Sequence, residues 1–160
     1  MLAGGESRKV GMDKRLRLLA DYLLKRSDAS QINPREIDAK ALPHLFILDI
    51  VRDQRGKLEG LRIRLTGTAL DKIFERKLVD RRLEEFVHGP RAVDVIGAFH
   101  NSAETGRALW MRQVVQMKDR PLRFVEGVTI PISPDRLYGG VVVGELAISE
   151  ESSFQSLALN

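Results

Sequence analysis

Segments with the alternation typical of β-strands fall into two groups along this 160-residue chain, and a helical stretch separates the groups. The first group covers residues 44–51 and 60–66, and the second covers residues 109–117, 122–132 and 137–148. Within each group short turn-like segments join consecutive strands, as they do in antiparallel pairs. The repeated alternation of strand and helix that a parallel doubly wound sheet needs is absent from the pattern. The order therefore predicts an α+β fold, in which an antiparallel sheet carries helices on one face.

The predicted helices lie before the first strand group and between the two groups. Leucines at helical spacing predict an amphipathic helix over residues 12–26, and Pro34 suits the start of a short helix over residues 34–41. Further helices are expected over residues 68–74, 83–87 and 93–106. We therefore divide the chain into an N-terminal helix and linker (residues 1–31), a folded domain (residues 32–149) and a frayed C-terminal tail (residues 150–160).

The predicted strands carry apolar residues on both faces. Leu109 and Met111 lie on one face, whereas Trp110, Val141 and Val143 are assigned to the other. A sheet with one solvated face would alternate more cleanly, so the second face needs a cover. The amphipathic helix is the available element, either in its own chain or across a dimer. We expect a homodimer, and the predicted interface consists of Leu16, Leu19, Leu23, Trp110, Val141 and Val143.

The composition of the chain limits the cellular compartment we expect for it and the kinds of site it can form. The chain has no cysteine, which excludes disulfides, thiolate metal sites and cysteine nucleophiles. Its first residues are charged where a secretory signal would have a short apolar core, and no apolar run approaches the roughly 20 residues that span a bilayer. We expect a soluble, cytoplasmic protein that does not enter a membrane.

The placement of the net charge of +4 argues against a nucleic-acid reader. The basic excess lies entirely in residues 1–26, whereas residues 27–160 hold nineteen basic and nineteen acidic side chains. A nucleic-acid-binding domain normally presents a basic face across its folded part. We expect no nucleic-acid partner, and attachment of the basic first helix to nucleic acid or to a membrane surface is the weakest hypothesis.

The folded region carries short motifs in its strands and at their ends: Leu42-Pro43, Asp49, Arg64, Gly67-Thr68 and Pro131. Together with the strand order, they resemble a divergent subfamily of PAS domains that occurs as short bacterial proteins, over about residues 32–148. The resemblance implies a five-stranded antiparallel sheet that cups a cavity against the central helices, often with an N-terminal helix that mediates dimerisation. It implies a sensory or protein-interaction module that signals through dimerisation or a separate partner, but no chemistry. The subfamily usually has glycines near the positions of Glu75 and Asp80, where this chain departs from it.

The histidines and one mid-strand carboxylate are the polar groups with functional interest. His44, His88 and His100 have no metal-ligand spacing, so no metal site is predicted. His100 could ligate haem beside the cavity, although a hydrogen-bonded or solvent-facing histidine is the commoner outcome, and no cofactor can be named. Glu126 is expected on the inward face, where it would recognise an amine or hydroxyl of a ligand. The alternatives for it are an ion pair with Arg64 or Arg112, or an outward-facing register.

No catalytic set can be placed by spacing, so no catalytic residue is predicted and the protein is not expected to be an enzyme. The competing hypothesis is a small isomerase-like or dehydratase-like enzyme with a cone-shaped α+β fold, using Glu126 and His100, but such folds begin with long helices that precede the whole sheet. The leading hypothesis is a PAS-type module with a small ligand between the sheet and the helices. The predicted ligand-binding residues are Leu70, Phe74, Ile96, Phe99, His100, Met111, Gln113 and Glu126.

Overall fold

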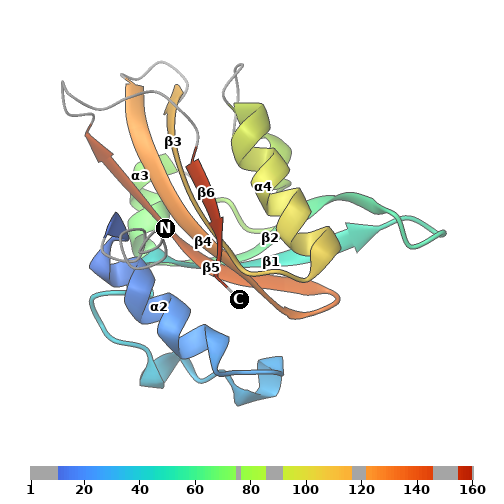
Figure 1. Cartoon of the computed structure of the whole chain (residues 1–160), viewed down its shortest axis with the longest axis horizontal. Helices are drawn as coiled ribbons and strands as arrows, with labels where there is room; N and C mark the ends of the chain where they lie inside the picture. The colour runs from blue at the N-terminus through green and yellow to red at the C-terminus, as the bar shows by residue number, and fades with distance from the viewer. Residues whose placement is uncertain (1–10, 75–76, 86–91, 117–121, 146–154, 160) are drawn as a thin grey trace, which may run out of the picture.

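A six-stranded antiparallel sheet organises the chain (Figure 1). The computed structural model describes residues 11–74, 77–85, 92–116, 122–145 and 155–159. The strands are β1 (Leu45–Arg52), β2 (Leu58–Thr66), β3 (Leu109–Gln116), β4 (Leu122–Ser133), β5 (Arg136–Glu145) and β6 (Gln155–Ala158). Their order across the sheet is β2-β1-β5-β4-β3-β6, and every neighbouring pair is antiparallel. The expected α+β class is confirmed.

The helical segments are close to the expected ones. They are α2 (Lys14–Leu24), α3 (Thr68–Phe74) and α4 (Ala92–Thr105), with short 3-10 turns η1 (Ala29–Gln31), η2 (Pro34–Glu36), η3 (Leu42–His44) and η4 (Leu83–Glu85). Where a helix was expected over residues 34–41, the chain forms the single turn η2 and then the turn η3. The expected turn at residues 83–87 is present as η4, and Val87 lies outside the described residues.

The hairpin between β1 and β2 turns at a residue that needs a left-handed backbone. The Asp53 carboxylate accepts hydrogen bonds from the backbone N–H groups of Arg55 (2.8 Å) and Lys57 (2.9 Å). Gly56 has a φ of +82°, a conformation that glycine adopts without steric cost. This local chemistry closes the hairpin that the sequence indicated.

The C-terminal segment was expected to fray, and for residues 155–158 this expectation is wrong. Strand β6 pairs with β3, so that Trp110 lies opposite Leu157. The backbone N–H of Leu159 continues the contact by donating to the carbonyl of Ala108 (2.8 Å). A four-residue strand with only one large apolar residue has too little pattern to be recognised alone, and it is the exposed edge of β3 that orders it. The sheet therefore has six strands, one more than expected.

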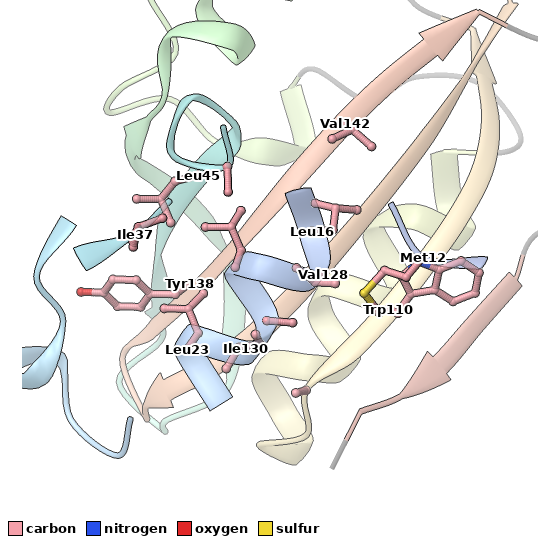
Figure 2. Packing of buried hydrophobic residues seen from close by; sticks show 14 of the residues in the cluster. Met12, Leu16, Leu23, Ile37, Leu45, Trp110, Val128, Ile130, Tyr138 and Val142 are labelled. Carbon is pink, nitrogen blue, oxygen red and sulfur yellow. The ribbon is translucent and has the colours of Figure 1, made fainter. Parts of the chain in front are cut away.

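The sheet separates two hydrophobic clusters. The first lies under α2 and contains Leu16, Leu19 and Leu23 together with Trp110 and Val128 of the sheet (Figure 2). The second lies under α3 and α4, on the opposite face. Its buried members include Phe46, Leu61, Leu70, Phe99 and Met111. The expectation that the second face of the sheet needs a helical cover is confirmed, and the helix belongs to the same chain.

Helix α2 packs closely because its apolar stripe meets a glycine. Leu16, Leu19 and Leu23 recur on one side of the helix, and each is 0% exposed. A Cβ atom at Gly140 of β5 would collide with Leu19 and would lie 3.1 Å from Leu16 Cδ2. Gly140 therefore lets the helix lie directly on the strand. Burial of each leucine stabilises this arrangement by about 1.5 to 3 kcal/mol.

Candidate functional site

The residues predicted to bind a ligand do not share one face of the sheet. Leu70, Phe99 and Met111 are buried in the cluster under α4, where Phe99 packs against Phe46 with ring centroids 5.6 Å apart. Gln113 is also buried, and its Nε2 lies 3.4 Å from Asp94 Oδ2 of α4. These four side chains therefore lie on the α4 face of the sheet.

The other predicted ligand residues lie elsewhere or beyond what is described. Ile96 is half-buried on α4, and the side chain of Phe74 is outside the described residues. His100 is half-buried at the flank of α4, where its Nε2 lies 2.7 Å from Glu84 Oε2. It thus faces η4 at the β2 edge, and it contacts neither Gln113 nor Glu126 by any hydrogen bond described.

Glu126 lies on the opposite face from the one expected. It is 4% exposed, and its Oε2 accepts hydrogen bonds from Trp110 Nε1 (3.0 Å) and from the backbone N–H of Asp13 (2.7 Å). Successive residues of a strand point to opposite faces, so Glu126 shares the α2 face with Val128 of the same strand. The prediction that Glu126 joins His100 and Gln113 in one cavity is therefore wrong. Of the two alternatives, an outward-facing register is wrong because Glu126 is buried, and the alternative ion pair with Arg64 or Arg112 is not among the contacts described for its carboxylate.

The carboxylate of Glu126 begins a chain of polar contacts at the start of α2. Asp13 is the N-cap of the helix, because its Oδ1 accepts from the backbone N–H of Arg15 (2.8 Å). The same carboxylate holds the Arg15 guanidinium through Nε (3.0 Å) and Nη2 (2.8 Å). Arg15 Nη1 then reaches His44 Nε2 (3.2 Å), and His44 Nδ1 reaches the carbonyl of Val141 (3.2 Å). We call Glu126, Asp13, Arg15 and His44 the latch.

The partners of His44 define its protonation. Arg15 can only donate and the Val141 carbonyl can only accept, so Nδ1 carries the proton and Nε2 accepts. Burial, and then the nearby Arg15 charge, lower the pKa of His44. The Arg15 hydrogen bond is the main cause that lowers the pKa of Asp13, and Asp13 in turn raises the pKa of Arg15. The latch therefore favours a neutral His44 imidazole beside the ion pair of Asp13 and Arg15.

The latch ties the N-terminal helix to several parts of the sheet. Glu126 belongs to β4, Trp110 to β3 and Val141 to β5, while His44 ends η3. A shift of any of these strands changes the fit of α2 at its first turn. The sequence analysis missed Asp13 and Arg15, although an aspartate immediately before a helical stripe is a recognised N-cap signal.

On the α4 face, one hydroxyl is left without a partner. Thr129 is 1% exposed, and its Oγ1 has no hydrogen-bond partner among the described residues. It lies opposite Leu109 on β3 and Gly139 on β5, so it faces the same side as Met111. A buried hydroxyl without a partner costs about 1 to 3 kcal/mol, so a polar group of a ligand at this position would be favourable.

The predicted dimer interface is also divided by the sheet. Leu16, Leu19, Leu23 and Trp110 lie on the α2 face and are buried within their own chain. Val141 packs against the cluster under α4. It is Val142, the next residue of β5, that is buried on the α2 face. Val143, half-buried, follows Val142 and so points to the side of Val141. The assignment of these residues to one interface is wrong, because Val141 and Val143 point to the face of the sheet opposite Trp110.

Comparison with models of protein families gives no match, and comparison with curated proteins gives no significant match. Within the described ranges, no three histidine, aspartate or glutamate side chains are grouped as a metal site would require. No helix among the same residues is both long and apolar enough to cross a bilayer.

Proposed function

We propose that this protein is a PAS-type sensory and protein-interaction module of the bacterial cytoplasm, in which the α4 face of the sheet receives a small molecule and the docking of α2 relays the signal. The chain order supports this proposal, since two strands, a helical cluster and three strands follow one another as the PAS resemblance implies. The sixth strand and the cover by α2 are additions to that core. A homodimer stays part of the proposal on the strength of the resemblance, with an interface other than the one expected from the sequence.

The observation that carries the proposal is the hydrogen bond that the buried Glu126 carboxylate accepts from the backbone N–H of Asp13, the N-cap of α2. Strand β4 presents Glu126 to α2, and it presents Val125 and Thr129 to the α4 face. A molecule that bonds Thr129 or displaces Val125 would move the same strand that holds α2. Strand β4 would thus couple ligand binding on the α4 face directly to the docking of α2 on the opposite face.

The enzyme alternative loses its main support. It required Glu126 and His100 in one cavity, whereas the sheet separates them. Glu126 is engaged by Trp110 and Asp13, and His100 by Glu84. Neither group has the shared position that an acid–base pair needs.

Native mass spectrometry of the freshly purified chain tests the sensing part. We expect a retained small molecule that denaturation releases, and we expect Thr129→Val, which keeps the shape but removes the hydroxyl, to retain less of it. Thr105→Val is the matched control, because Thr105 is exposed on α4 and its hydroxyl, among the described residues, bonds only the Asn101 carbonyl and the Arg107 backbone N–H. Equal retention in both variants, or no retained molecule in the wild type, would contradict the sensing part.

A screen with substrates of hydrolases, isomerases and dehydratases distinguishes the sensory proposal from the enzyme alternative. We expect no turnover above background in the wild type. Turnover that disappears in Glu126→Gln or in His100→Ala would overturn the sensory proposal in favour of the enzyme.

A further inference from the structure

A row of charged side chains crosses three neighbouring strands on the α2 face, beyond the area that α2 covers. Asp49 of β1 is in register with Arg136 of β5 on one side and with Arg62 of β2 on the other. Arg64 follows on β2, where a register irregularity lets it reach Asp49 as well. Neighbouring strands are about 4.8 Å apart, so the guanidinium groups of the row lie within reach of a single extended or helical segment. We call Arg62, Arg64, Arg136 and Asp49 the arginine row.

We propose that the arginine row is the docking surface for an acidic, amphipathic segment of a signalling partner. This inference rests on the proposed function, in which the signal passes to a separate protein partner.

The charge of the row is unbalanced. Asp49 holds two arginines, with Oδ2 at 3.1 Å from Arg64 Nη1 and Oδ1 at 3.5 Å from Arg136 Nε. Among the described residues, the Arg62 side chain has no hydrogen bond or ion pair. Arg64 and Arg136 keep 47% and 32% of their side-chain surface exposed. One carboxylate thus orders two guanidinium groups while leaving positive charge for a partner's carboxylates, which arginine binds through two parallel hydrogen bonds.

Apolar side chains flank the row on the same face. Leu65 is 40% exposed and lies opposite Ile47, which is half-buried beside the α2 cluster. Val51, two residues after Asp49, is also half-buried on this face. Cations beside exposed apolar surface suit a segment that carries both carboxylates and apolar residues.

Other occupants fit less well. A second copy of the chain would bring arginines against arginines across a two-fold interface, which is unfavourable. A nucleic acid would meet the central carboxylate of Asp49 and would gain nothing from Leu65. The balanced charge of residues 27–160 also lacks the broad basic face that nucleic-acid readers use.

The test uses a fluorescein-labelled synthetic helical peptide with leucines on one face and glutamates beside them, measured by fluorescence anisotropy at low salt. We expect binding to the full chain that weakens as salt is raised, because the contacts are exposed. The double variant Arg62→Glu and Arg64→Glu should weaken binding about tenfold or more. The double variant Lys72→Glu and Lys77→Glu has the same net charge but leaves the row intact, and it should bind like the wild type.

A second comparison tests whether the row prefers an amphipathic acidic segment or binds any anion equally. Leu65→Ser should weaken binding of the leucine–glutamate peptide, and it should leave unchanged the weaker binding of a peptide in which serines replace the leucines. Equal affinity of the wild type and the Arg62/Arg64 variant would overturn the proposal. Tighter binding of a single-stranded oligonucleotide than of the peptide would also overturn it, in favour of nucleic acid.

The outcome is distinguishable from failure of the proposed function. Peptide binding tests the arginine row on the α2 face, whereas native mass spectrometry tests ligand retention at Thr129 on the α4 face. Loss of the docking surface with a retained small molecule would reject only the partner segment. Circular dichroism and thermal unfolding of the Arg62/Arg64 variant should match those of the wild type, which shows that the fold is intact.

Discussion

Glu126 places a carboxyl group in an almost fully buried position, where Trp110 and the Asp13 backbone both donate to the same oxygen. Such a group is tolerated only when its hydrogen bonds are made, and the donors in turn depend on it. At the scale of single residues, the latch therefore decides how firmly the first turn of α2 is held.

Replacement of Glu126 by leucine should lower the free energy of unfolding by about 1 to 3 kcal/mol, because the buried Trp110 donor and the partly buried Asp13 N–H lose their acceptor. Glu126→Gln keeps an acceptor oxygen and should cost less. Urea unfolding followed by Trp110 fluorescence measures both. Glu59→Gln is the control, because Glu59 is 47% exposed and pairs with Arg82 only at 3.9 Å. A leucine variant as stable as the wild type would show that the latch contributes nothing.

His44 should make stability depend on mild acid. Burial, then Arg15, lowers its pKa in the folded chain, whereas the unfolded chain titrates near about 6.5. The unfolded chain therefore binds more protons as the pH falls below about 6.5, and the free energy of unfolding should fall with it. The lowered pKa of Asp13 acts in the same direction but only below about pH 4, where the unfolded chain protonates this carboxylate before the folded chain does, so that its contribution is lost as the pH falls through the folded pKa.

Urea midpoints between pH 8 and pH 5 measure the histidine effect. The fall of the urea midpoint towards pH 5 should be smaller in His44→Gln, because glutamine keeps polar atoms near Arg15 and Val141 but does not titrate. His100→Gln is the matched control at the Glu84 contact. An unchanged decline in His44→Gln would assign the pH dependence to another group.

At the scale of elements, α2 is the part of the chain whose partner the sequence left open. Its leucine stripe suits either its own sheet or that of a second copy, since the spacing is the same in both cases. Within one chain the stripe is fully buried, and Gly140 gives the helix its close approach.

Leu19→Asp should release α2 and lower the free energy of unfolding by at least about 3 kcal/mol, because it removes a buried leucine and buries a charge. Hydrogen exchange should show loss of protection over residues 14–24. Leu18→Asp is the control next to it, since Leu18 is 40% exposed and its change should leave α2 protected. Equal protection of α2 in both variants would contradict the packing described.

At the scale of the whole molecule, the homodimer is the prediction least supported by packing. The uncovered sheet face that motivated it is covered by α2 in the same chain. Light scattering should still report about twice the mass of 18.0 kDa if the PAS resemblance extends to assembly. A monomer at high micromolar concentration would remove dimerisation from the proposed function and leave signalling to a separate partner.

The sequence alone determined the α+β class, the strand groups and the amphipathic first helix, because hydrophobic periodicity is a local property. It could not place Glu126, Val141 or Val143, because strands with apolar residues on both faces do not tell which face is which, and a shift of one residue exchanges them. Strand β6 and the latch were decided by tertiary structure for a related reason. Their stability comes from an edge of β3 and from donors on distant elements, 113 residues apart in the case of Asp13 and Glu126. Contacts of that range leave no periodic trace in the sequence, so only the packed sheet brings their residues together.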